Sequence, residues 1–131
     1  MRSVLYAINS NAQTVAAGGI ASVDTVIRKA GNNIDLAGNG IRITGAGFYE
    51  VLVSLDFTAA AGAATIQLLQ DNVPVQGAVA IRTTAAGTTY TVTIPAVVRE
   101  YCACNGGSIL TVQVNGVAAE ILSQSVIVEK L

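Results

Sequence analysis

The longest regular alternation of side chains in the sequence lies between residues 49 and 57. The odd-numbered positions are apolar: Tyr49, Val51, Val53, Leu55 and Phe57. The even-numbered positions carry Glu50, Leu52, Ser54 and Asp56. A period of two indicates a β-strand with one face in a hydrophobic core. Because the other face is mixed rather than charged, we expect that it does not meet bulk water along its whole length.

Extended segments separated by turn residues, about one turn every ten positions, fill the rest of the chain. They cover residues 4–8, 13–23, 25–28, 34–36, 41–43, 64–69, 73–75, 79–83, 88–95, 97–103, 109–114 and 121–131. No segment combines the apolar repeat of a helix with helix caps. The pattern predicts an all-β sandwich or barrel of about ten strands. Since no linker interrupts it, we expect a single domain over residues 1–131.

Glycine, proline and asparagine predict particular breaks in this pattern. Gly18 and Gly19 indicate a bulge or a change of sheet. Asn39 with Gly40 suits a hairpin turn that requires positive φ, and we expect a second hairpin at Asn115 and Gly116. Pro74 places its segment at a sheet edge or a bulge, and Pro95 is expected to end a strand.

The composition indicates a large hidden surface. Charged residues make up 11% of the chain and hydrophobic residues 52%, whereas an ordinary soluble domain carries roughly 25% charged residues. Such a chain either enters a membrane or covers part of its surface with another chain. No apolar run reaches the roughly 20 residues of a membrane-spanning helix, and the N-terminus has no signal-peptide pattern. Self-association is therefore the better explanation of the composition. The net charge of −1 gives no positively charged surface for binding nucleic acid.

The sequence offers few groups for catalysis or for metal and cofactor binding. It contains no histidine, the commonest general base. The eight acidic residues are scattered singly, without the spacing of a calcium-binding loop. The glycines at 38–40 and 45–47 lack the third glycine and the following helix of a dinucleotide fingerprint. We therefore expect a protein that is not an enzyme and has no cofactor or metal site.

Cys102 and Cys104 are the one pair of residues that invites a more specific interpretation. Two residues at i and i+2 of a strand point to the same face. They are interpreted first as small, partly buried thiols beside a turn. Interchain disulfides or a soft-metal site shared between copies are the alternatives, although no further ligand is identifiable.

The order of several segments resembles the tumour necrosis factor and complement globular-head superfamily. A glycine turn and an aromatic pair precede the alternating strand, at Gly45, Gly47, Phe48 and Tyr49. The segment 68–75, with its polar turn, and the closing segments 105–112 and 125–131 are also similar to that family. The opening residues 12–19 are similar to bacterial members, such as the C-terminal domains of collagen-like exosporium glycoproteins, and to small phage structural proteins of Firmicutes. The resemblance covers nearly the whole chain.

This resemblance implies a ten-stranded jelly-roll sandwich of two antiparallel sheets that assembles as a compact homotrimer. In the family, the sheet containing the first, central and last strands packs around the threefold axis. Mapped onto this chain, the expected interface is Tyr6, Phe48, Leu52, Ser54 and Ile127. Many relatives have a collagen-like stalk that this chain lacks, so the resemblance does not explain its attachment to a larger object.

The leading functional hypothesis is a non-enzymatic structural protein, a trimeric knob used for decoration or attachment. The knob would be displayed on a phage virion, as a decoration or a head or tail fibre, or on a bacterial or spore surface. Its partners would be its own copies and a capsid, tail or surface-layer protein.

The alternative is a lectin-like module that binds a cell-surface glycan through polar loops at one end. The candidate residues of those loops are Asn32, Asn33, Asp71, Asn72 and Asn105.

Overall fold

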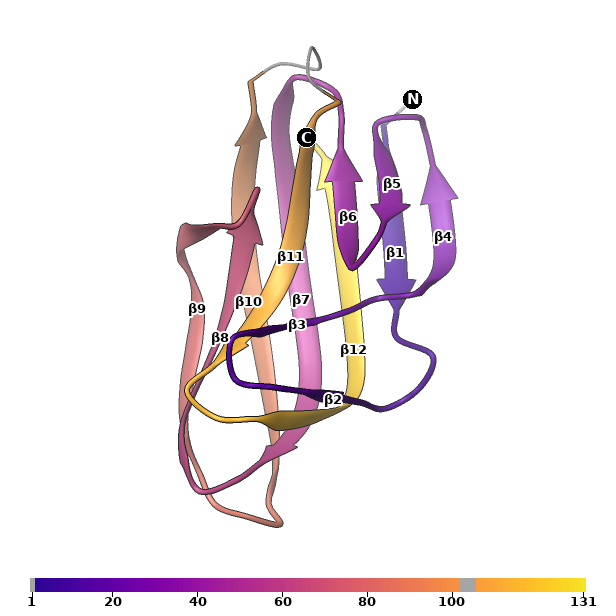
Figure 1. Ribbon diagram of the computed structural model, residues 1–131. Helices are drawn as coiled ribbons and strands as arrows, with labels where there is room; N and C mark the ends of the chain where they lie inside the picture. The colour runs from indigo at the N-terminus through magenta and orange to yellow at the C-terminus, as the bar shows by residue number, and fades with distance from the viewer. Residues whose placement is uncertain (1, 102–105) are drawn as a thin grey trace.

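The structure is a computed structural model that describes residues 2–101 and 106–131. These residues form twelve β-strands. The strands are β1 (Val4–Ile8), β2 (Gln13–Val15), β3 (Gly19–Ala21), β4 (Thr25–Ala30), β5 (Ile34–Ala37), β6 (Gly40–Ile43), β7 (Gly47–Ala59), β8 (Gly62–Gln70), β9 (Val73–Thr84), β10 (Thr89–Glu100), β11 (Ser108–Asn115) and β12 (Ala119–Lys130) (Figure 1).

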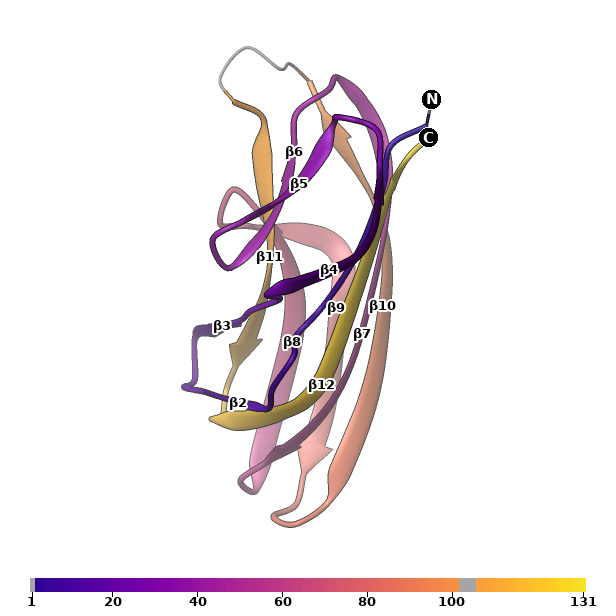
Figure 2. The same ribbon diagram turned by 90° about the vertical axis from the view of Figure 1, so that its right-hand side faces the viewer.

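The strands form two six-stranded antiparallel sheets packed face to face as a jelly roll. Sheet A has the order β10-β7-β12-β1-β4, with β2 also paired to β12. Sheet B has the order β5-β6-β11-β8-β9, with β3 also paired to β11. Figure 2 shows the two layers from the side, with β7, β10 and β12 curving together along one of them. The first, central and last strands thus share one sheet, as the resemblance implies.

The predicted two-sheet all-β sandwich is confirmed, but the predicted number of ten strands is wrong. The described part of the chain has twelve strands, and two of them, β2 and β3, contain only three residues each. They arise because the segment 13–23 leaves sheet A after Val15 and joins sheet B at Gly19. The change of sheet predicted at Gly18 and Gly19 is therefore confirmed.

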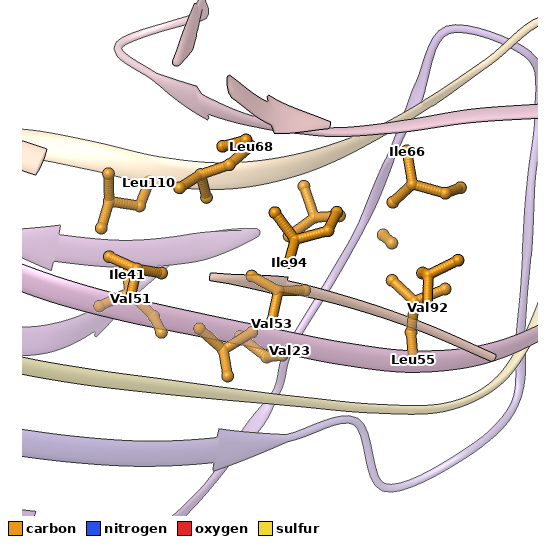
Figure 3. Close-up of a cluster of buried hydrophobic side chains, with 14 of the residues drawn as sticks. Val23, Ile41, Val51, Val53, Leu55, Ile66, Leu68, Val92, Ile94 and Leu110 are labelled. Carbon is orange, nitrogen blue, oxygen red and sulfur yellow. The ribbon is translucent and has the colours of Figure 1, made fainter. Parts of the chain in front are cut away.

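The alternating segment is confirmed as the central strand β7, which pairs with β10 on one side and β12 on the other. Its inward residues, Tyr49 to Phe57 at every second position, are at most 1% exposed. They pack against apolar residues from sheet B, and Figure 3 shows Val51, Val53 and Leu55 among Ile41, Ile66, Leu68 and Leu110. The burial of these side chains between the sheets supplies the main stabilisation of the fold.

The structure confirms the predicted hairpin between residues 34–36 and 41–43 and the predicted edge position of Pro74. Residues 38 and 39 form the two-residue turn of the β5–β6 hairpin. The positive φ falls on Gly38, at 55°, rather than on Asn39, which suits a glycine in the first central position of the turn. Pro74 lies in β9, which is an edge strand of sheet B as predicted.

Two other turn predictions are wrong. Strand β10 continues through Pro95 to Glu100. Because β10 is an edge strand of sheet A, a residue without an N–H group is tolerated on the side away from β7. Asn115 and Gly116 do not form a hairpin, because β11 belongs to sheet B and β12 to sheet A. They begin a crossover between the sheets, in which Ala119 pairs with Ala59 of β7.

The buried Tyr49 fixes the turn that precedes β7. Its Oη donates a hydrogen bond to the carbonyl oxygen of Gly45 at 2.6 Å, and it accepts one from the Gly45 N–H at 3.1 Å. The side chain is fully buried. Burial, together with the negative charge of Glu100, raises the pKa of Tyr49 above its ordinary value.

We predict that Tyr49→Phe lowers the free energy of unfolding by about 1–3 kcal/mol, because the buried N–H and C=O of Gly45 lose their partner. Tyr90→Phe is the control, since the Tyr90 hydroxyl accepts one hydrogen bond, from the exposed Ala85 N–H at 2.8 Å. Denaturant unfolding at pH 8 measures both variants. Equal losses in the two variants would contradict the assignment.

Stability is also expected to fall at alkaline pH in a way that depends on Tyr49. The folded state holds the Tyr49 proton more tightly than the unfolded chain does. The stabilisation of the folded state by protonated Tyr49 is therefore complete below about pH 10, and it is lost as the pH rises past that value. Unfolding curves between pH 9 and 11.5 should show a shallower decline in Tyr49→Phe than in the unmodified protein. Parallel declines would show that another group is responsible.

A pair of glycine variants tests the crossover. Gly116 has a φ of 89°, and a Cβ there would lie 2.1 Å from the carbonyl oxygen of Ala63. Gly87 has a similar φ of 80° but no atom within 4 Å of such a Cβ. Gly87→Ala should therefore lower the free energy of unfolding only by the about 1–2 kcal/mol that a residue with a Cβ loses in the left-handed conformation. Gly116→Ala should cost at least about 1–3 kcal/mol more, because the backbone must shift. Similar unfolding midpoints for the two variants would show that residue 116 has free space.

Candidate subunit interface

The outer face of sheet B presents polar side chains that bond to one another. The Nε2 of Gln67 donates to the Oε1 of Gln113 at 2.8 Å, and the Nδ2 of Asn115 donates to the same oxygen at 2.9 Å. The Nε2 of Gln113 donates to the carbonyl oxygen of Gly18 at 3.2 Å. These amides lie at the middle of the face, beside exposed apolar residues of the edge strand β9, Val79 and Ile81, and beside the charged Arg42 and Asp35 of β6 and β5.

The outer face of sheet A presents a row of apolar side chains across the middle of the sheet. The strand registers place Pro95, Leu52, Ile127 and Tyr6 side by side across β10, β7, β12 and β1. We call these four residues the apolar row. Leu52 and Ile127 are each 38% exposed, and two neighbours on the same face, Phe48 and Val97, are 51% and 58% exposed. Contiguous apolar groups on an otherwise polar exterior are typical of a protein interface.

All five residues expected at a subunit interface lie on this outer face of sheet A. Tyr6, Leu52 and Ile127 are adjacent in the apolar row. Ser54 and Phe48 lie further along β7 on the same face. Their contact with another copy stays a prediction. Pro95, Val97 and Arg99 lie on this face too, although the sequence analysis did not include them. The apolar alternation at 90, 92 and 94 continues at 96 and 98, so it would have placed 97 and 99 on the outward face had Pro95 been assigned to an edge strand.

Beside the apolar row, the same face contains a polar hollow of about 240 Å³. A register shift between Ile121 and Ser123 of β12 creates a bulge at this point. Tyr6, Ser54 and Ser125 line the hollow together with Asp56 and Ser123. The carboxylate of Asp56 accepts hydrogen bonds from the hydroxyls of Thr91 at 2.5 Å and Ser123 at 3.1 Å. The half of the face near the bulge is therefore polar, with Asp56 bonded to side chains of its own chain.

Charged residues and aromatic rings adjoin the other side of the apolar row. The Arg99 guanidinium lies over the rings of Phe48 and Tyr101, with its Cζ 5.4 Å and 4.4 Å from their centroids. Glu50 of β7 is directly opposite Glu129 of β12. Glu129 pairs with Arg2, N to O, at 3.3 Å. The apolar row thus lies between a charged region and the polar hollow.

The residues expected to bind a glycan are only partly available for a ligand. Asn33 accepts a hydrogen bond from the hydroxyl of Ser3 at 3.2 Å through its side chain and one from the N–H of Thr44 at 2.9 Å through its carbonyl oxygen. Asp71 accepts one from the N–H of Ile109 at 2.9 Å. Asn32 and Asn72 are exposed in the connections that precede β5 and β9. The structure therefore uses two of these residues to hold turns, and glycan binding stays a prediction.

Three predicted site residues, Asn105, Cys102 and Cys104, lie outside the described residues. Within the described residues, β9 and β10 border a hollow of about 540 Å³. Its lining includes Asp71, Val97 and Tyr101. Over residues 2–101 and 106–131, the protein has no helix long and apolar enough to cross a membrane.

No family model and no curated protein matches this chain. Solved structures do match it. Murine APRIL, crystallised at pH 8.5, has a TM-score of 0.79 at 16% identity, with 100% of both chains covered. The globular domain of zebrafish complement 1qA protein has a TM-score of 0.71 at 9% identity, covering 98% of this chain and 96% of its own. The PRD1 vertex protein P5 has a TM-score of 0.66 at 12% identity, with 98% and 96% covered. The chain therefore has, over nearly its whole length, the jelly-roll fold of the tumour necrosis factor and complement globular-head structures.

Proposed function

We propose that this protein is a non-enzymatic structural protein that assembles into a homotrimer through the outer face of sheet A. The trimer would be a compact knob on the surface of a phage virion, a bacterium or a spore. There it would decorate the surface or attach it to a partner, anchored by a capsid, tail or surface-layer protein.

The observation that carries the proposal is the apolar row. The middle of the outer face of sheet B carries bonded amides, and its exposed apolar residues, Val79 and Ile81, lie on the edge strand β9. The apolar row does the opposite at the centre of sheet A. With only 11% charged residues in the whole chain, leaving this face in water would favour association in any case. A closed, symmetric oligomer buries it without open-ended aggregation.

A surface role is supported by the fold and by one of the matching structures. The solved structure titled PRD1 vertex protein P5 shares this fold over nearly the whole chain. At 12% identity it supports a role in a particle without identifying which particle. The scarcity of candidate catalytic groups in the sequence, which contains no histidine, supports a structural role over an enzymatic one.

The first test is the mass of the purified protein in solution. One chain is 13.3 kDa, so a homotrimer should give about 40 kDa by size-exclusion chromatography with light scattering. The mass should stay at that value on dilution into the micromolar range. A mass of one chain at micromolar concentration would overturn the proposal.

A second test targets the apolar row directly. We predict that Leu52→Lys reduces the trimer fraction strongly, because the buried contact would have to accept an unpaired ammonium group. Ile109→Lys is the matched control, since Ile109 is a half-exposed residue of the same size on the outer face of sheet B. Light scattering should show a trimer for the control and smaller species for Leu52→Lys. Loss of the trimer in both variants, or in neither, would argue against this face as the interface.

Location can be tested on intact particles. Antibodies raised against the purified protein should label phage particles, whole cells or spores from the source without permeabilisation. Labelling that requires lysis of every one of these would contradict display on a surface.

A further inference from the structure

Sheet B has a joint where two of its strands meet end to end. Strands β3 and β6 both pair with the same side of β11, β3 along residues 112–114 and β6 along residues 108–110. Thr111 lies between these two stretches. A small hollow lies at the joint, between the two sheets, and we call it the joint hollow. Its lining includes Ala21, Asn39, Gly40, Thr111, Gln124 and Val126.

Gln124 is directed into the core by the bulge in β12. Ile121 faces the core, and unbroken alternation would place Ser123 inside and Gln124 outside. The register shift between Ile121 and Ser123 reverses this order, so that Gln124 is 3% exposed while Ser123 is exposed. Bulges redirect side chains in this way. A polar amide therefore lies among apolar core residues, including Val23, Ile41 and Leu68, which also line the joint hollow (Figure 3).

Only one half of the Gln124 amide is bonded within the described part of the protein. Its Nε2 donates to the carbonyl oxygen of Ala21, the last residue of β3, at 3.3 Å. Since a carbonyl oxygen only accepts hydrogen bonds, the amide nitrogen must face Ala21. The Oε1 of the same amide is buried and has no hydrogen-bond partner among the described residues. This oxygen needs a donor at the joint hollow.

Thr111 brings a second buried oxygen to the same hollow. Among residues 2–101 and 106–131, three buried side-chain atoms have no hydrogen-bond partner. Two of the three, the Oγ1 of Thr111 and the Oε1 of Gln124, belong to residues that line the joint hollow. Buried polar groups are nearly always hydrogen-bonded in folded proteins, because an unpaired one is costly. Two such oxygens at one hollow indicate a partner that they share.

The joint hollow has the size and the chemistry for one water molecule. The centre of a water-sized sphere can move within about 10 Å³ of it, and about 10–15 Å³ of such space is enough for one water. None of the described residues that line it is charged, which suits a neutral guest rather than an ion. The Thr111 hydroxyl can donate, the Gln124 Oε1 only accepts, and water does both.

We propose that one water molecule is a fixed part of the core at the joint hollow. It donates a hydrogen bond to the Oε1 of Gln124 and accepts one from the hydroxyl of Thr111. The water then joins β12 of sheet A to β11 of sheet B, beside the direct bond from Gln124 to the end of β3. Such a bridge is nearly as favourable in enthalpy as a direct hydrogen bond. Because the joint hollow is not part of the apolar row, this inference does not depend on the proposed trimer.

A crystal structure of the unmodified protein, at a resolution that shows ordered water, tests the site directly. A peak of electron density should lie in the joint hollow, within about 2.5–3.0 Å of both the Gln124 Oε1 and the Thr111 Oγ1. A hollow without density, or a peak that reaches only one of the two oxygens, would overturn the proposal.

The sign of a stability change gives a second test. Thr111→Val deletes the hydroxyl. If a water is bound, this variant takes away one of its partners, and the melting temperature should fall by about 3–5 °C relative to Thr65→Val. If the Thr111 Oγ1 is unpaired, its removal should raise the melting temperature instead. Thr65→Val is the matched control, because Thr65 is also half-buried on the outer face of sheet B, in the neighbouring strand β8. A melting temperature of Thr111→Val equal to or above that of the control, at the same protein concentration, would contradict the bridge.

A double-mutant cycle tests whether Thr111 and Gln124 share their partner. Gln124→Met removes the acceptor of the proposed water together with the bond to Ala21. If one water joins the two side chains, either single variant already weakens its binding. The double variant should then lose less melting temperature than the sum of the two single losses. Losses that add up would show that the two residues have no common partner.

Discussion

The structure depends on the burial of one face of β7. This strand pairs with β10 and β12 along almost its whole length, and its inward side chains from Tyr49 to Phe57 fill the space between the sheets. Side chains in a strand alternate, so a shift of one residue in either pairing would turn this entire set outward. The core therefore fixes the register, and the register decides which residues share the outer face.

The apolar row is a consequence of that register. Once Val53 and Val51 face the core, Leu52 must face outward between Pro95 and Ile127. Sheet B obeys the same rule, but the outward positions of β8 and β11 include three amides, Gln67, Gln113 and Asn115, that bond to one another. The alternation alone would permit either composition on an outer face. The difference at the centre of the two faces thus belongs to the sequence rather than to the fold, and it is the reason for proposing sheet A as the face that meets another chain.

The sequence predicts what depends on local periodicity and leaves open what depends on the assignment of strands to sheets. The strand at 49–57 and the outward position of Leu52 follow from alternation alone. The two ends of the 13–23 segment were separable because Gly18 and Gly19 interrupt it. By contrast, Asn115 and Gly116 have the local chemistry of a hairpin turn, and only the three-dimensional arrangement shows that the following strand joins the other sheet. The prediction that Pro95 ends a strand fails for a similar reason, since proline ends a central strand but is tolerated in an edge strand, so the sequence alone does not place Val97 and Arg99 on the outer face of β10.

An apolar row by itself would specify association poorly. Hydrophobic contact is non-directional, so a face composed only of groups such as Leu52 and Ile127 could pair with another copy in several registers and in either direction. Charges next to such a face exclude the arrangements that leave them unpaired or bring like charges together. Glu50 beside Glu129 makes a wrongly placed acidic neighbour costly, while Arg99, held by Phe48 and Tyr101, offers one fixed donor edge. In a protein with so few charges, the apolar area would supply the affinity of the proposed assembly, and the charges beside it would limit the arrangements that it can adopt.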